Sequence, residues 1–296
     1  MLNITLDIYS GLRNPTFNFL EDEETKIILK EIALNKRAIT PLSKEVTRLG
    51  YRGINITFKS DYLPQLYGLP SSFSLANGLS TIESKGREIA ERLLERTKSI
   101  SDAVVNNSNF TLSLIDWTVN QIKDMPVFSH PQNELHSTLE DNVMFCPSEK
   151  VVFDPNFWNN RDHIQHNNCY NFATNRRTDS YAQPGRASGH MYNNITCEEV
   201  RKGAISDGAD VAGRCFPENE KPRFLMALVI APGPSFIDYH WYRQCSDGNW
   251  AHKPGQTPAR NTDESNHIIT DPSTANRGPY TQFCGYMLAP KSMDID

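Results

Sequence analysis

Residues 224–231 read F-L-M-A-L-V-I-A, and residues 237–244 read I-D-Y-H-W-Y-R-Q. The first stretch is a continuous apolar run, which is typical of a strand buried on both faces. The run is broken by Pro232-Gly233-Pro234, and the second stretch is followed by the hairpin turn signal Ser246-Asp247-Gly248-Asn249, which leads into Trp250 and His252. These signals predict an antiparallel sheet in the C-terminal half of the chain.

The first part of the chain carries a different pattern. Alternating apolar residues predict strands over 2–9 and 51–58, and the turn signal at 10–15 ends the first of them. Helical periodicity predicts helices over 21–35 and 83–99. We therefore expect a small α+β unit in this part of the chain.

The expected fold class is α+β throughout, divided into two domains. We expect a small module of unknown role over 1–125 and a connector over 126–150, where Pro126, Pro131 and Pro147 interrupt any regular period. The C-terminal domain is expected over 151–296, where the chain is rich in Asn, Gly, Pro, Tyr and Trp and poor in helical pattern. There we expect a helix packed on an antiparallel sheet.

The composition excludes some classes of partner. The 296 residues include 30 basic and 35 acidic side chains, for a formal net charge of -5. This balance gives no general electrostatic reason to bind nucleic acid or an anionic membrane. No apolar run approaches the roughly 20 residues that a membrane helix needs. We therefore expect neither nucleic acid nor membrane as a partner.

The N-terminal residues and the cysteines bear on the compartment. The chain begins M-L-N-I-T-L-D-I-Y-S-G, without the basic and apolar regions of a secretory signal. We expect a cytoplasmic protein, or one exported by a route without a classical signal peptide. Six cysteines are present, none in a C-x-x-C pair, and without an export signal we expect them to be mostly reduced.

Cys169 is the candidate nucleophile. It stands in the stretch 167–174, N-N-C-Y-N-F-A-T, and the residues after it can form one or two helical turns. A cysteine at a helix start faces unpaired N–H groups and the positive end of the helix dipole, which favour the thiolate and lower the thiol pKa. The same N–H groups can stabilise an oxyanion.

His240 is the candidate general base, because a strand holds its ring rigidly. His252 lies twelve positions later, across the predicted turn. Residues on either side of a tight turn can face each other on antiparallel strands, so we expect His252 to hydrogen-bond His240 and to hold its ring for proton transfer from Cys169. Asp238 and Asn261 compete with His252 for this third position.

The order of a cysteine at a helix start, a histidine on a strand and a polar residue after a hairpin resembles the NlpC and CHAP branches of the papain-like superfamily. The stretch Cys169-Tyr170-Asn171-Phe172-Ala173 is similar to the CHAP nucleophile segment, and the spacing from His240 to His252 is near that of the NlpC histidines. The resemblance covers about residues 160–255 and implies a papain-like fold that hydrolyses peptide or amide bonds, often in cell-wall peptides, without a metal or another cofactor. The N-terminal S-G-L-R-N-P at 10–15 resembles an S-G-R-x-N-P turn of an uncharacterised bacterial module, which implies no activity.

The expected reaction is that of a cysteine hydrolase or acyl transferase on a peptide, protein or cell-wall peptide. His240 takes the proton of Cys169, the thiolate attacks the carbonyl, and an acyl-enzyme forms, which water or an amine then releases. We expect the Cys169 backbone N–H and Asn168 or Gln165 to stabilise the oxyanion. Three arginines near Gln183-Pro184-Gly185 are candidates for a clamp on a substrate carboxylate or phosphate, namely Arg176, Arg177 and Arg186.

Two other interpretations of the site stay open. Cys169 and His240 can be core residues of a degenerate papain-like module that binds a partner without catalysis. A zinc-dependent hydrolase is a second alternative, because His163, His166 and Cys169 would share one side of a helix. The aromatic residues of this region are expected to serve packing, namely Trp241, Tyr242, Trp250 and Tyr280.

Overall fold

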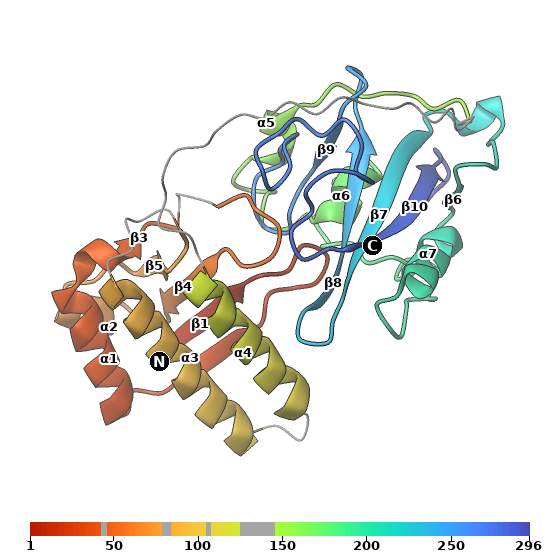
Figure 1. Cartoon of the computed structure of the whole chain (residues 1–296). Coiled ribbons are helices and arrows are strands. Elements are labelled where there is room, and N and C mark those ends of the chain that lie inside the picture. The colour runs from red at the N-terminus through yellow and green to blue at the C-terminus, as the bar shows by residue number, and fades with distance from the viewer. Residues whose placement is uncertain (43–45, 79–83, 105–107, 125–145) are drawn as a thin grey trace.

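The computed structural model of the chain describes residues 1–42, 46–78, 84–104, 108–124 and 146–296. Within these residues the protein has an α+β fold with two five-stranded sheets, each accompanied by its own helices (Figure 1). The paired strands of both sheets are antiparallel. The expected fold class is therefore confirmed at this level. The expected connector falls largely on 125–145, outside the described residues.

The first sheet belongs to the N-terminal half. Its strand order is β2-β1-β4-β5-β3, with bounds β1 Leu2–Asp7, β2 Thr16–Phe19, β3 Ile39–Thr40, β4 Gly53–Phe58 and β5 Ser72–Leu75. Alternation along β1 buries Leu2, Ile4 and Leu6 on one face, as the sequence predicted. The intervening side chains of Thr5 and Asp7 face a polar cavity on the other side.

The helices of this half pack beside one another (Figure 1). Their bounds are α1 Glu23–Leu34, η1 Lys36–Ala38, α2 Tyr62–Tyr67, α3 Ser84–Val104 and α4 Ser108–Asp124. The start of α1 follows from local chemistry, because the Asp22 side chain accepts the N–H of Thr25 and acidic residues occupy the first turn. Helices α1 and α3 confirm two predicted helices, whereas α2 and α4 were not predicted.

The second sheet belongs to the C-terminal half. Its strand order is β6-β10-β7-β8-β9, with bounds β6 Asp210–Val211, β7 Phe224–Pro232, β8 Ile237–Gln244, β9 Trp250–His252 and β10 Gln282–Ala289. Strand β8 pairs with β7 over its first seven residues, but with β9 only from Tyr242 to Gln244. The first part of β8 therefore has one edge that β9 does not cover.

The remaining helices are α5 Pro155–Trp158, α6 Cys169–Ala173, α7 Cys197–Ser206 and η2 Glu218–Glu220. Helix α6 packs against β8, β7 and β9 (Figure 1). The predicted strands over 224–231 and 237–244 and the helix start at Cys169 are thus confirmed.

The two halves share one hydrophobic core. A single cluster of buried side chains contains residues of β1, β4, α1 and α3 together with Leu225, Ala227 and Val229 of β7. At the junction, Phe236 stacks on Tyr9 at 5.5 Å and on Trp117 at 4.4 Å between ring centroids. The N-terminal half is therefore packed directly on the sheet that carries the predicted site.

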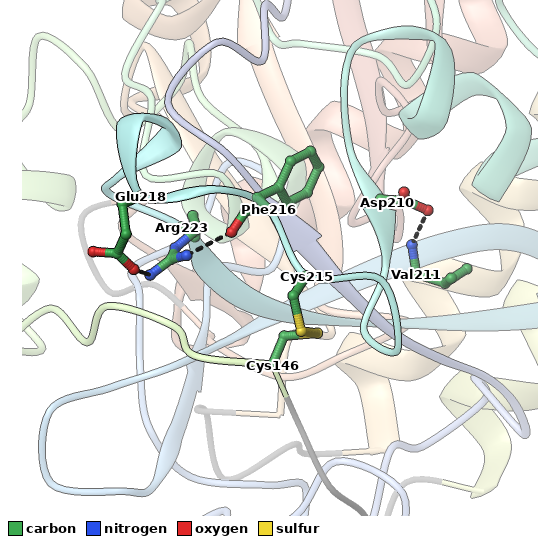
Figure 2. Close-up of a disulfide and its surroundings, with 7 residues drawn as sticks. All are labelled: Cys146, Asp210, Val211, Cys215, Phe216, Glu218 and Arg223. Carbon is green, nitrogen blue, oxygen red and sulfur yellow. Dashed lines mark hydrogen bonds and ion pairs between the residues drawn. A yellow bond between two sulfur atoms is a disulfide. The ribbon is translucent and has the colours of Figure 1, made fainter.

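Four of the six cysteines form disulfides, Cys146–Cys215 and Cys197–Cys284. The expectation of mostly reduced cysteines is therefore wrong. Figure 2 shows the first bond near Arg223, whose guanidinium donates to Glu218 and to the carbonyl of Phe216. Cys169 and Cys245 are free and buried.

No helix among the described residues is long and apolar enough to cross a membrane.

Candidate functional site

Helix α6 begins at Cys169 because its neighbours cap it. The side-chain oxygen of Asn168 accepts the N–H groups of Tyr170 at 3.0 Å and Asn171 at 3.2 Å, and the Asn171 side chain accepts the N–H of Asn168 at 3.1 Å. This reciprocal capping box satisfies N–H groups that a helix start leaves without partners. It fixes Cys169 as the first residue of the helix.

The sulfur of Cys169 lies against the uncovered edge of β8. It is 4.0 Å from the carbonyl oxygen of Tyr239, and the backbone N–H of Trp241 hydrogen-bonds the sulfur. Tyr239 and Trp241 flank His240 on the strand, so the sulfur contacts the backbone on both sides of the candidate base. The fold therefore brings Cys169 beside the backbone of the strand segment that carries His240, across 71 positions of sequence. The Cys169 side chain packs with Tyr239 and Trp241, whereas the His240 ring lies with Tyr242 on the other face of β8, so the expected contact between sulfur and imidazole is not formed in this conformation.

Cys169 is fully buried. Burial raises the pKa of its thiol well above the ordinary value, and the Asp238 carboxylate acts in the same direction. The N–H groups of Trp241 and Cys169 lower the pKa but do not offset the burial. The expectation that the helix start lowers the thiol pKa is therefore wrong for this conformation, in which the sulfur is a neutral thiol.

His240 and His252 form the predicted pair, with Nε2 of His240 2.8 Å from Nδ1 of His252. Both rings are fully buried, and burial lowers the pKa of each well below the ordinary histidine value. Neighbouring positive charge, chiefly from Arg260 for His252, lowers these pKa values further. Both rings are therefore neutral near pH 7, and the expected contact between them is confirmed.

The hydrogen bonds assign the tautomer of each ring. Nε2 of His252 is 3.0 Å from the carbonyl oxygen of Thr262, which can only accept, so this nitrogen carries the proton. Nδ1 of the neutral His252 is then an acceptor, and Nε2 of His240 must donate to it. Nδ1 of His240 is left with a lone pair, and this buried atom has no hydrogen-bond partner among the described residues. That is the protonation state a general base requires.

Packed aromatic rings hold this pair in place. Tyr242 stacks on His252 at 5.0 Å and meets His240 edge-on at 4.8 Å between centroids, and Tyr280 lies 5.7 Å from His240. Tyr242 and Tyr280 are buried, in keeping with the packing role expected for them.

Asp238 binds the N-terminal half instead of His240. Its carboxylate accepts the backbone N–H groups of Ser10 at 2.6 Å, Gly11 at 3.2 Å and Leu12 at 3.1 Å, and the hydroxyl of Tyr280 at 2.6 Å. Burial raises the pKa of Asp238 to about 6, against the lowering effect of these hydrogen bonds. The idea of Asp238 as the third member of the triad is therefore wrong, because loop residues occupy its oxygens.

Among the described residues, no hydrogen bond joins Asn261 to His240 or His252. The backbone carbonyl of Asn261 accepts the N–H of Ile269, in the loop that follows β9.

Two side-chain amides next to Cys169 converge on one carbonyl oxygen. Asn168 donates to the carbonyl of Gly11 at 3.1 Å, and Gln183 donates to it at 3.0 Å. The side-chain oxygen of Gln183 is itself fixed by the hydroxyls of Tyr239 at 2.9 Å and Tyr192 at 2.7 Å. Asn168 was predicted as an oxyanion donor, whereas sequence reasoning missed Gln183. Its position in the Gln183-Pro184-Gly185 turn between arginines was the available signal.

The other predicted substrate-binding residues lie elsewhere. Gln165 is exposed and lines a polar cavity of about 440 Å³ between the two halves, with Asn14 and Gln256 among its other walls. Arg177 donates to the carbonyl of Phe157 at 2.8 Å and lies over its ring, and Arg186 donates to the carbonyl of Ser180 at 2.9 Å. The expected roles of these three residues at the nucleophile are not supported by their contacts. Arg176 donates to the carbonyl of Pro290 at 3.0 Å.

The zinc alternative requires His163, His166 and Cys169 on one helix face, but residues 161–166 form turns. His163 contacts the carboxylate of Asp179 at 2.9 Å. Among the residues described, no group of three or more His, Cys, Asp or Glu side chains is arranged to hold a metal ion. The predicted ligand set is therefore not assembled.

Sequence reasoning also missed Lys253, which follows His252 and is fully buried. Its ammonium group donates to the carbonyls of Ile164 at 2.7 Å, Asn167 at 2.6 Å and Gly255 at 2.5 Å. These bonds hold the segment that leads into Cys169 against the strand that carries His252.

Comparison with known proteins gives one clear relative. The chain is 46% identical over 135 residues to "Insoluble matrix shell protein 1" of the mollusc Ruditapes philippinarum, and the match spans 46% of this chain and 87% of that protein. No family model and no solved structure matches the chain.

Proposed function

Because this chain belongs to the family of insoluble matrix shell protein 1, we propose that it works outside the cell, in an extracellular matrix. The relative's name refers to the insoluble matrix of a shell. The two disulfides support the same compartment, since such bonds persist in oxidising environments and are rare in the cytosol.

We further propose that the C-terminal half is a papain-like cysteine hydrolase or acyl transferase. The observation that carries this proposal is the histidine pair on the strand whose backbone contacts the Cys169 sulfur. Nε2 of His240 donates to His252, and its unprotonated Nδ1 has no partner among the described residues. A base oriented by a third group is two parts of a nucleophile–base–orienter triad. The His240 ring packs on Tyr242 and Tyr280, so the proposed proton transfer requires a rearrangement that brings the ring to the sulfur.

The proposed reaction uses these residues in turn. The Cys169 thiol transfers its proton to Nδ1 of His240, and the sulfur forms a bond to the carbonyl carbon of a peptide or amide. The amide groups of Asn168 and Gln183 stabilise the carbonyl oxygen as it becomes negative. The C–N bond then breaks, and His240 returns the proton to the departing amine. Water or a second amine releases the acyl group, giving hydrolysis or a new amide cross-link.

A non-catalytic matrix component is the second candidate, and one observation favours it. Cys169 and His240 are both fully buried in this conformation, and the Gly11 carbonyl already occupies the two amide donors. A degenerate site retained for packing would have the same burial.

Alkylation of the full chain by iodoacetamide near neutral pH separates the candidates. Cys245 is the internal control, because it is also a free and buried thiol. Catalytic pairing predicts that the ratio of the Cys169 rate to the Cys245 rate falls about 10-fold or more in His240→Ala and is kept in His163→Ala. A ratio that is the same in His240→Ala as in the parent chain would assign the site to packing.

A further inference from the structure

The loop Ser10–Leu12 of the N-terminal half reaches across to the proposed site. Figure 1 shows the end of β1 directed toward β8, and three N–H groups of this loop bind Asp238 at the start of that strand. The hydroxyl of Tyr181 donates to the carbonyl of Leu12 at 3.1 Å. The loop is therefore held mostly through its backbone, by contacts that a different peptide can also make.

Gly11 stands at the centre of this contact. Its carbonyl accepts from Asn168 and Gln183, and Asn168 is the residue directly before the nucleophile. The carbonyl oxygen of Tyr239, which lies 4.0 Å from the Cys169 sulfur, is also the backbone atom nearest to a Cβ built on Gly11. Gly11 and Cys169 thus meet the same carbonyl of β8.

The space around Gly11 admits no side chain. A Cβ added there would lie 2.6 Å from the Tyr239 ring and 2.7 Å from the Tyr239 carbonyl oxygen. The ring is held by the hydrogen bond from its hydroxyl to Gln183, and the oxygen belongs to the strand, so neither can move aside easily. The site therefore selects glycine by exclusion.

We propose that Ser10–Leu12 occupies the substrate subsite of this chain, and that the subsite takes peptides with glycine in the place of Gly11. The loop acts as a built-in occupant, and substrate reaches Cys169 when the loop is released. That the ligand of this subsite is a substrate rests on the proposed function. The glycine subsite itself rests on the contacts of Gly11.

The Gly11→Ala variant of the full chain tests the occupant. The added methyl group is expected to release the loop and to raise the iodoacetamide rate at Cys169 about 10-fold, with the rate at Cys245 unchanged. Gly213→Ala is the matched control, because a Cβ at Gly213 meets nothing within 4 Å. Asp238→Asn, which weakens the anchor without a clash, is expected to give a smaller increase. A rise at both cysteines would report general unfolding, and Asp238→Asn then decides the question.

The glycine selectivity is tested on Gly11→Ala with two capped peptides, Ser-Gly-Leu-Arg-Asn-Pro and Ser-Ala-Leu-Arg-Asn-Pro. The glycine peptide is expected to protect Cys169 from alkylation, and the alanine peptide is not. Equal Cys169 rates in Gly11→Ala, Asp238→Asn and Gly213→Ala, or equal protection by both peptides, would overturn the proposal. Adding His240→Ala to the opened variant tests the function separately. If the Cys169 rate is then unchanged, the loop is an occupant of a site that is not catalytic.

Discussion

The carbonyl of Thr262 determines which nitrogen of His240 is free to accept a proton. The two residues are linked through the ring of His252, which donates to Thr262 at 3.0 Å and accepts from His240 at 2.8 Å. Each hydrogen bond fixes the next tautomer in turn, so a backbone atom in the loop after β9 sets the chemistry of a ring on β8.

This linkage predicts the effect of losing His252. His252→Ala removes the acceptor for Nε2 of His240, so the proton of that ring is free to move to Nδ1 and the base is lost. We expect the alkylation rate of Cys169 relative to Cys245 to fall about 10-fold or more. His267→Ala, at an exposed position, is the matched control and should leave the ratio unchanged. An unchanged ratio in His252→Ala would argue against the triad.

The buried histidine pair predicts lability in acid. Burial lowers the pKa of both rings in the folded chain, so below about pH 6.5 the unfolded chain binds more protons and stability falls as the pH falls. Each histidine contributes a loss of about 1.4 kcal/mol for each pH unit below its unfolded pKa. Asp238, with its pKa raised to about 6, acts in the opposite sense between about pH 4 and 6, and so do Asp207 and Glu264, whose pKa values burial also raises.

The measurement is thermal unfolding from pH 7.5 to pH 5. The midpoint should drop with acidity in the parent chain and drop less steeply in a variant with glutamine at both 240 and 252. A midpoint that changes with pH to the same extent in both chains would contradict the assignment of both rings as neutral.

Lys253 is expected to be important for stability. Lys253→Met leaves three buried carbonyls without their charged donor and should lower the free energy of unfolding by about 3 kcal/mol or more, measured in urea. Lys202→Met is the control, because that lysine is exposed in a surface pair with Glu198 and should change stability by less than about 0.5 kcal/mol. Equal effects of the two changes would contradict the buried contacts.

The disulfides predict a thiol count. Denatured without reductant, the chain should show two reactive thiols, from Cys169 and Cys245, and after reduction it should show six. Replacing Cys197 and Cys284 together by serine opens a link that spans 87 positions, and we expect a loss of about 4 kcal/mol in unfolding free energy. Six reactive thiols before reduction would reject both bonds.

Local patterns predicted much of the C-terminal sheet. Neighbouring residues determine three of its features, namely the apolar run of β7, the turn before β9 and the polar start of α6. The pairing of His240 with His252 follows from the short hairpin that joins their strands. Strand β10 was missed because the irregular register between Phe283 and Gly285 interrupts its alternation. Helix α7 carried a signal that was not used, since Thr196 and Glu199 have the spacing of a capping box.

Contacts between distant segments were not predictable from local patterns. Gly11 and Gln183 are 172 positions apart, and their contact depends on how the two halves pack. The thiol pKa of Cys169 depends on the same packing, because burial outweighs the helix start. The disulfides join residues 69 and 87 positions apart, with no short motif to mark them.

All six cysteines lie at or after position 146, so no covalent bridge other than the main chain joins the N-terminal half to the C-terminal sheet. The attachment between them consists of the shared core and of hydrogen bonds such as those at Asp238. A force that pulls the first half from the second would therefore break only non-covalent contacts, with both disulfides left intact. It would also withdraw the Gly11 carbonyl from the amide groups of Asn168 and Gln183.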